Sequence, residues 1–264
     1  MAGERLYPEL PYHIGFFGRV HPRGTKISIH EVRVIHYLDD EKKKKLTLNI
    51  VPYVNNSVIA IDCYFDPFIE NCARVILPVV LTAIRAQIDL VSFMLGAGTV
   101  VTIDWMKDHN GVTSPISLAQ SDLSALCTSF SEKHNYKELK NMATGDMAMS
   151  LALNDLILAQ TVPKLAEVNC ARAMEGIRHI IAGQGTEPKV AWPIMQTALN
   201  IDGAYRQLIT NNSIPRRHGQ LTIIEEKTIE EILRRSWVIM DRFFHYRLQG
   251  DTQLSIDQFP LLSG

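Results

Sequence analysis

The sequence predicts an α+β protein: an N-terminal antiparallel sheet with one long helix, followed by a C-terminal all-α bundle of four to five helices. Short runs of β-branched and aromatic residues, separated by turn residues, fill the first quarter of the chain. A long apolar stretch of helical character follows. From about residue 134 onward apolar residues recur at the helical period and no convincing strand is visible.

The composition is that of an ordinary globular protein. The chain has 264 residues, of which 46% are hydrophobic and 21% charged, enough for one large domain or two small ones. We expect an α+β domain over residues 1–115, a connector over 116–133, a helical bundle over 134–250 and a poorly ordered tail over 251–264.

Four β-rich runs predict the sheet, which we expect to be an antiparallel meander. They cover Tyr12–Val20, Lys26–Leu38, Leu46–Val54 and Val58–Phe65. The lysine run of residues 42–45 follows three acidic residues and contains no aromatic residue, which favours a solvated hairpin tip over a nucleic-acid patch.

The long helix should begin at Asp66 and Pro67, because aspartate caps free helical amides and proline suits the first helical position. Pro78 should kink it. The glycines of Gly96–Gly98 should end it, and the alternating segment Thr99–Lys107 should return to the sheet as a further strand.

We expect a cytoplasmic protein that does not enter a membrane. The longest apolar run, Val75–Leu95, is interrupted by Arg85, Gln87 and Asp89, which are costly inside a bilayer. This favours a buried helix of a soluble domain. The segment Met1–Arg5 lacks the layout of a secretion signal.

In the C-terminal half the apolar spacing predicts helices at about residues 147–159, 162–183, 190–210 and 225–249. Glycines at 183 and 185 mark the end of the second helix. The last helix directs a continuous apolar face inward, with two glutamates at its favourable N-terminal end.

Several classes of function have no support in the sequence. The cysteines show neither zinc-ligand spacing nor neighbouring histidines, so we expect no metal. No phosphate-binding glycine loop, serine-hydrolase elbow or zinc-protease motif is present, and we expect no cofactor. A net charge of −1 and the lack of a DNA-binding signature mean that any nucleic-acid contact requires a local basic patch.

The first such patch lies in the segment Cys170–His179. Arg172, Glu175 and His179 stand at positions i, i+3 and i+7, so on a helix they share one stripe and can reach a common ligand. Arg178 should point elsewhere, toward solvent. The alternative is structural: Glu175 pairs with one of the arginines and braces the bundle.

The second patch should occupy a loop between the third and fourth predicted helices. It comprises Asn211, Asn212, Arg216, Arg217 and His218. Guanidinium groups bind phosphate in a forked geometry, and a neutral imidazole can accept a proton from a ribose hydroxyl and later return one. These residue types suit RNA binding or cleavage. The alternative is a loop that caps helices or docks on an acidic partner.

Two short motifs carry a resemblance to a known family. Ala171–Arg178 spells Ala-Arg-Ala-Met-Glu-Gly-Ile-Arg and Arg217–Gly219 spells Arg-His-Gly, and over roughly residues 134–249 the chain resembles the HEPN superfamily. The β-rich N-terminal half makes the layout similar to that of ApeA-like proteins. The resemblance implies a metal-independent endoribonuclease site of an arginine and a nearby histidine, often at a homodimer interface, in toxins and phage-defence effectors, or an inactive RNA-binding relative.

Carried over to this chain, the resemblance makes His218 the general acid and base. Residues 211–213 hold no arginine where the family has one, so Arg172 would supply it, with Arg217 holding the scissile phosphate and Glu175 orienting Arg172. Arg172 and His179 form a second pair at a similar spacing.

We therefore expect a HEPN-like protein that binds RNA as a homodimer and acts as an endoribonuclease in stress or phage defence. The alternative is a non-catalytic homodimeric sensor or interaction module that binds a protein or a small ligand. A third reading is a small-molecule enzyme with its pocket between the domains.

Overall fold

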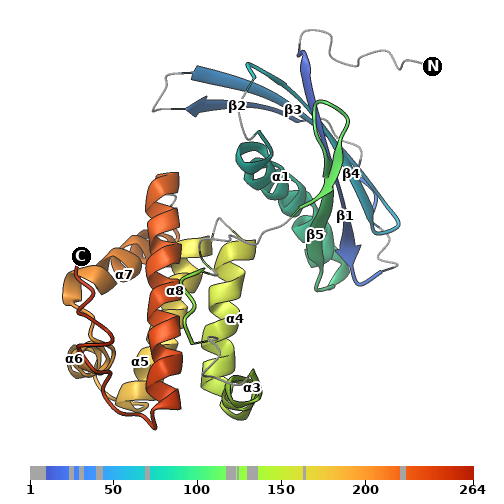
Figure 1. The fold of residues 1–264 in the computed structure, drawn as a ribbon. Coiled ribbons are helices and arrows are strands. Elements are labelled where there is room, and N and C mark those ends of the chain that lie inside the picture. Colours follow the sequence, from blue (N-terminus) through green and yellow to red (C-terminus); the bar gives the residue numbers. More distant parts are fainter. Residues whose placement is uncertain are drawn as a thin grey trace. The chain divides into compact units, whose positions relative to one another are not determined.

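The structure, a computed structural model, describes residues 10–23, 27–29, 33–39, 44–68, 72–116, 123, 125–129, 136–162, 165–220 and 224–264. The chain divides into two compact units, Met1–Ser117 and Leu118–Gly264, each with its own hydrophobic core (Figure 1). The first holds an antiparallel sheet and one long helix, and the second is all-α. The predicted α+β class is confirmed.

The sheet of the N-terminal unit has six antiparallel strands in the order β2-β3-β4-β1-β5-β6. The strands are β1 Tyr12–His21, β2 Arg33–Asp39, β3 Lys44–Asn55, β4 Val58–Asp66, β5 Val100–Lys107 and β6 Thr113–Pro115. The expected meander is correct from β2 to β4 but wrong for β1, which pairs with β4 on one side and with β5 on the other. Helix α1 separates β4 from β5 in the chain, and β5 pairs with the side of β1 that faces away from β4.

Two details of the sheet differ from the sequence prediction. The expected strand at 26–38 is shorter, since β2 begins at Arg33 and Ile29 only forms an isolated bridge with Val54. The expected hairpin tip at residues 40–43 lies outside the described residues. At the bulge between β1 and β5, a side chain at Gly18 would clash with the carbonyl oxygen of Thr102, so this position needs glycine.

Helix α1, Cys72–Leu95, covers one face of the sheet with a buried row at helical spacing (Figure 1). This row contains Ile76, Val80, Ala83, Ile84 and Ile88. The predicted start at Asp66 is wrong, because Asp66 pairs with Thr47 as the last residue of β4. The predicted end is correct, since Gly96 follows with a positive φ of 61°.

The apolar sequence of α1 has two interpretations, a membrane-spanning segment or a helix that packs on the sheet. By length and composition its segment Val75–Leu95 is able to cross a membrane, which is weak evidence because core helices of soluble proteins pass the same test. One face of α1 is buried against the sheet, whereas the large side chains at its C-terminal end, such as Phe93 and Met94, are exposed.

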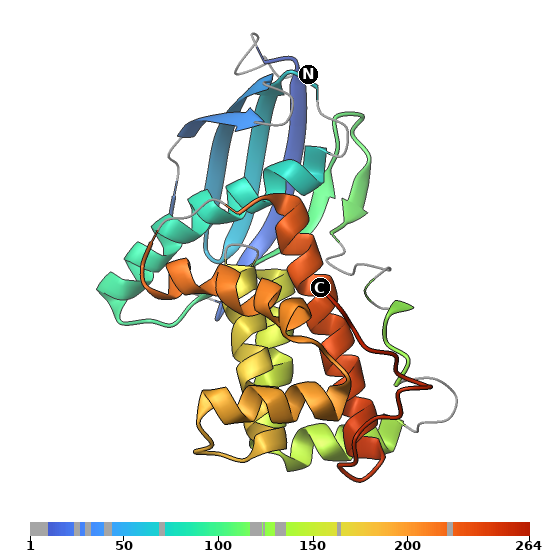
Figure 2. The same ribbon diagram turned by 90° about the vertical axis from the view of Figure 1, so that its left-hand side faces the viewer.

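The helical unit is organised around α5. Its helices are α3 Tyr136–Gly145, α4 Met147–Thr161, α5 Ala166–Ala182, α6 Pro188–Leu199, α7 Gly203–Arg217 and α8 Glu226–Leu248. Helix α5 contacts α4, α6, α7 and α8 (Figures 1 and 2). Helices α4 and α5 approach closely at Gly176, where an added Cβ would lie 3.1 Å from the Cβ of Ala152.

The predicted third helix is in fact two helices, and the predicted polar loop is helical. Asn200 ends α6 in the left-handed conformation, with φ of 52°. Asp202 then caps α7 by accepting a hydrogen bond from the N–H of Tyr205 at 2.6 Å. Because the helix restarts at this cap, residues 211–217 form its last two turns, and only His218 and Gly219 belong to the turn that follows.

The predicted disorder of the C-terminal tail is wrong. The buried guanidinium of Arg242 on α8 donates hydrogen bonds to the backbone oxygens of Leu199, Asn200 and Pro260 at 2.8, 2.8 and 2.6 Å. Leu254 is buried in the helical core. The tail therefore runs back past α6 toward the start of α7 (Figures 1 and 2).

Replacing this guanidinium should weaken the whole helical unit. In Arg242→Met three carbonyl groups, two of them buried, lose this donor, and we expect the free energy of unfolding to fall by about 3 kcal/mol. Urea denaturation measures the loss, and limited proteolysis should cut the tail faster. The control Arg247→Met replaces another arginine of α8, removes its exposed ion pair with Asp251 just past the end of the helix, and should cost less than about 1 kcal/mol. Equal stability of the two variants would contradict the assigned role.

Candidate functional site

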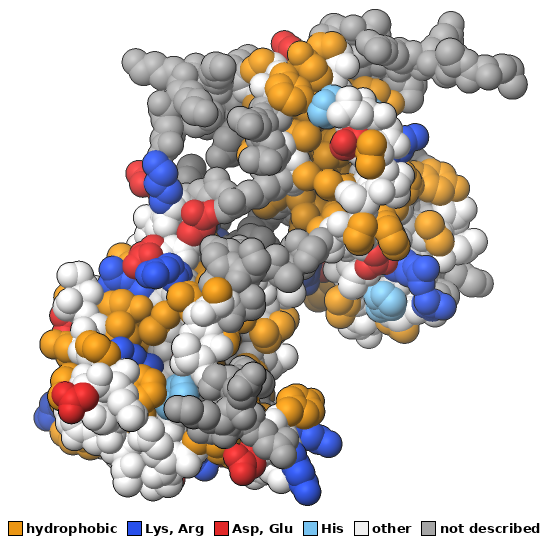
Figure 3. All heavy atoms as spheres, in the orientation of Figure 1, with side chains coloured by type: hydrophobic (Ala, Val, Ile, Leu, Met, Phe, Trp, Pro, Cys, Tyr) orange, Lys and Arg blue, Asp and Glu red, His pale blue; other side chains and the backbone are white. Residues whose placement is uncertain are grey.

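Helices α5 and α7 bring together the two basic clusters that the sequence singled out. Arg217 on α7 donates to Glu175 on α5 at 2.7 Å, across 42 positions of the chain. One position earlier, the Nε atom of Arg216 lies 2.8 Å from a carboxylate oxygen of Glu167. In Figure 3, Lys and Arg side chains gather beside Asp and Glu side chains over α7 and α8.

The carboxylate of Glu167 lies in the interior of the helical unit. It is fully buried, and among the residues that the structure describes neither of its oxygens accepts a well-aligned hydrogen bond, while the guanidinium of Arg216 supplies an opposite charge. Burial raises the pKa of Glu167, while its own backbone N–H and the charge of Arg216 act in the opposite direction. Burial likewise raises the pKa of the neighbouring Cys170 thiol to about 12, so this cysteine is not a nucleophile at neutral pH.

The expected pairing of Glu175 with Arg172 is wrong. Arg172 instead pairs with Asp155 of α4 at 3.3 Å, with its own side chain 58% exposed. Burial raises the pKa of Asp155 and the positive charge of Arg172 lowers it. The sequence could not reveal this pair because the carboxylate comes from another helix. Arg172, Glu175 and His179 nevertheless share one stripe of α5, as their spacing predicts.

Arg178 was expected to reach solvent, and it does not. Its side chain is only 7% exposed, and its guanidinium lies 4.8 Å from the ring centre of Trp192. One N–H group of Arg178 lies 2.7 Å from Nε2 of His179. Because guanidinium has no acceptor, that histidine nitrogen must accept the bond. Arg206 of α7 lies over the same indole at 4.5 Å. Trp192 and Arg206 are not recognisable from the sequence, since no local pattern links residues on α6 and α7 to α5.

The remaining predicted residues lie at the end of α7. His218 is the C-cap, and its backbone N–H bonds to the carbonyl oxygens of Ile214 and Pro215. The His218 imidazole is exposed and has no partner among the residues that the structure describes. Asn211 is exposed, whereas the Asn212 amide donates to the Leu208 carbonyl within its own helix.

A second polar cluster joins the connector to α8. The hydroxyl of Thr128 donates to Asp241 at 2.7 Å and lies 2.9 Å from His245, and the N–H of Ser129 donates to Asp241 at 2.8 Å. Because the hydroxyl proton is directed at the carboxylate, the imidazole is not positioned to remove it. The cluster therefore anchors the connector.

These groups define what the surface can do chemically. In the described part of the chain no three His, Cys, Asp or Glu side chains gather in a way that would hold a metal ion. The exposed groups are the guanidiniums of Arg172 and Arg217 and the imidazole of His218. They suit anion binding and proton transfer.

Residues 136–248 match a family described as "Domain of unknown function (DUF8168) C-terminal domain". The match begins with α3 and ends with α8, so it covers the helices of the second unit without the tail. No curated protein and no solved structure matches the chain. These comparisons identify no activity.

The raised pKa of Glu167 predicts a pH-dependent stability. The carboxyl group of Glu167 titrates at about pH 4.3 in the unfolded chain and at a higher pH in the folded protein. As pH rises through this window, the wild type becomes less stable relative to Glu167→Gln, and the difference then stays constant. Melting temperatures of both proteins between about pH 4 and pH 8 measure it. Glu175→Gln controls for the loss of an Arg–Glu pair. If the melting temperature of the wild type instead increased relative to that of Glu167→Gln as the pH rises, the result would contradict a raised pKa of Glu167.

Proposed function

We propose that the protein is a cytoplasmic, HEPN-like RNA-binding protein of a stress or phage-defence response, and that it cleaves RNA without a metal. One observation carries the proposal. The contact between Arg217 and Glu175 joins the end of α7 to the stripe of α5, so cations and histidines from two distant segments share one surface.

The exposed guanidiniums on this surface retain capacity for phosphate. The side chains of Arg172 and Arg217 are 58% and 40% exposed, and among the described residues each pairs with one carboxylate. A guanidinium has five donors, so N–H groups remain for a phosphate oxygen. The carboxylates also fix the direction of each arginine. The exposed imidazole of His218 would exchange protons with a ribose hydroxyl and the leaving group.

A specific observation favours the alternative, a non-catalytic binding module. Carboxylates pair with Arg172, Arg216 and Arg217. Residues 211–213, where the HEPN superfamily has its arginine, lie within α7 and include no arginine. A scissile phosphate would have to compete with these carboxylates for its guanidiniums. Binding is compatible with that competition, and only an activity measurement separates the two functions.

The proposal is tested with the purified full-length chain. Arg217→Ala should weaken binding of single-stranded RNA about fivefold and reduce its salt dependence, because one phosphate contact is lost. Fluorescence anisotropy at several salt concentrations measures both effects. The matched control Arg247→Ala removes another arginine that is paired with a carboxylate. Equal affinity of Arg217→Ala and the wild type for single-stranded RNA would contradict the RNA-binding proposal.

The same protein samples test cleavage of total RNA and transfer RNA in the presence of a chelator. We expect cleavage by the wild type and its loss in His218→Ala and Arg172→Ala. RNA binding without cleavage by the wild type would leave the non-catalytic module as the function.

We further propose that a second copy of the chain is a partner, through α4. This helix is apolar on all sides, yet large side chains on its outer face are exposed: Met147, Leu151, Ile157 and Leu158. A helix of this kind normally lies inside a core or an interface. Light scattering should give a dimer mass for the wild type and a monomer mass for Leu151→Asp. A monomeric wild type would refute the dimer.

A further inference from the structure

Two arginines from different helices share one aromatic ring in the helical unit. The guanidinium of Arg178 on α5 lies 4.8 Å from the ring centre of Trp192 on α6, and that of Arg206 on α7 lies 4.5 Å from it. Cation–aromatic attraction stabilises each contact by a modest amount, and more when water is excluded. It does not remove the repulsion between the two positive charges.

Within the described part of the chain, no carboxylate compensates the positive charge of this pair. Arg178 makes one hydrogen bond, to His179, and Arg206 makes one, to the hydroxyl of Thr210 at 3.1 Å. The Nε atoms of both arginines are buried without a hydrogen-bond partner. No carboxylate of the residues that the structure describes lies within 4.0 Å of either guanidinium. Burial lowers the pKa of Arg206, and the charge of Arg178 lowers it further.

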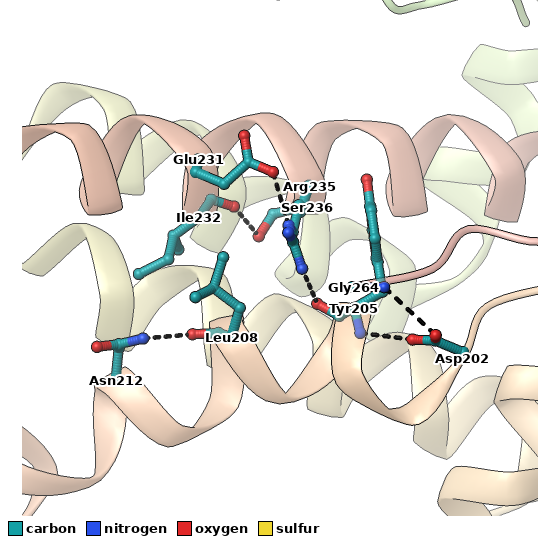
Figure 4. Close-up of polar contacts among 9 residues, drawn as sticks. All are labelled: Asp202, Tyr205, Leu208, Asn212, Glu231, Ile232, Arg235, Ser236 and Gly264. Atoms are coloured by element: carbon teal, nitrogen blue, oxygen red, sulfur yellow. Dashed lines mark hydrogen bonds and ion pairs between the residues drawn. The ribbon is translucent and has the colours of Figure 1, made fainter.

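Elsewhere the same unit compensates its stacked arginines. Arg235 lies 4.6 Å from the ring centre of Tyr205, donates to Glu231 at 2.7 Å and also donates to the Tyr205 carbonyl at 3.2 Å (Figure 4). Arg242 lies over Phe259 and donates to three backbone carbonyls. The pair at Trp192 is therefore a departure from how this protein treats a buried arginine, and one oxyanion would supply what is missing.

We propose that Arg178 and Arg206 form a binding site for the phosphate group of a small molecule, such as inorganic phosphate or a phosphate monoester. A doubly charged phosphate matches two guanidiniums in charge, and its oxygens accept from the forked N–H groups. The Thr210 hydroxyl lies beside Arg206 as a further donor. The 7% exposure of Arg178 favours a terminal phosphate over the phosphodiesters of an RNA backbone. This site goes beyond the proposed RNA surface and does not depend on it, because Trp192 and Arg206 are not part of that surface.

Thermal unfolding of the full-length chain in sodium phosphate and in sodium chloride of equal ionic strength, near neutral pH, tests the site. The wild type should melt about 3 °C higher in saturating phosphate. Arg206→Gln should lose this shift, and in chloride it should be at least as stable as the wild type because the repulsion is relieved. The matched control Arg235→Gln, which removes a stacked arginine already paired with Glu231, should keep the shift. An equal shift in Arg206→Gln, or none in the wild type, would overturn the proposal.

Titration calorimetry distinguishes the sources of the phosphate. Inorganic phosphate, adenosine monophosphate and an RNA oligonucleotide with a 5′-phosphate should each bind less tightly to Arg206→Gln than to the wild type, whereas the hydroxyl-ended oligonucleotide should bind both equally. If Arg206→Gln weakened binding of the hydroxyl-ended oligonucleotide alone, Arg206 would contact the RNA backbone, and the proposed small-molecule site would be overturned. If Arg206→Gln does not fold, Arg206→Lys, which keeps the charge and removes the fork, should weaken phosphate binding in the same assay.

Discussion

The burial of charge on α5 is the constraint on which the helical unit depends. Because four other helices surround α5, its ionisable side chains cannot all reach water. Glu167 is fully buried, and its charge is compensated by Arg216, which α7 brings alongside. Breaking such a pair would leave a buried charge at a cost of several kcal/mol, about 3 to 5 in typical cases. The docking of α7 on α5 is thus fixed by electrostatics as well as by apolar packing.

The same constraint separates two kinds of arginine. Arg172 and Arg217 lie at the surface, each with a carboxylate partner, and retain donors that a polymeric anion can reach from solvent. Arg178 and Arg206 lie deeper, share Trp192 and have no such partner among the described residues. The guanidiniums of Arg235 and Arg242 donate to carboxylate or carbonyl oxygens, whereas the Nε atoms of Arg178 and Arg206 have no acceptor among the described residues. We interpret the surface as suited to RNA and the deeper pair as suited to a small phosphate.

The candidate site was only partly predictable. The sequence pointed to Arg178, His179 and Arg217 because charged residues among core residues of a helix require partners or a ligand. It assigned Glu175 to the wrong arginine and placed Arg178 in solvent, because helical spacing fixes the direction of a side chain but not the neighbouring helix that it meets. Trp192 and Arg206 carry no local signal at all. Their role arises only where α5, α6 and α7 meet.

The sequence by itself determined the α+β class, the long helix α1 and the all-α second half, because periodicity and turn residues act over a few positions. Tertiary structure decided the position of β1 between β4 and β5, since these pairings join residues 39 to 92 positions apart, from Arg19 with Val58 to Gly15 with Lys107. It also decided the break at Asn200, which is held by the tail through Leu254 and by Arg242. Long-range contacts of this kind leave no trace in local spacing, and they determine which charges of α5 are compensated.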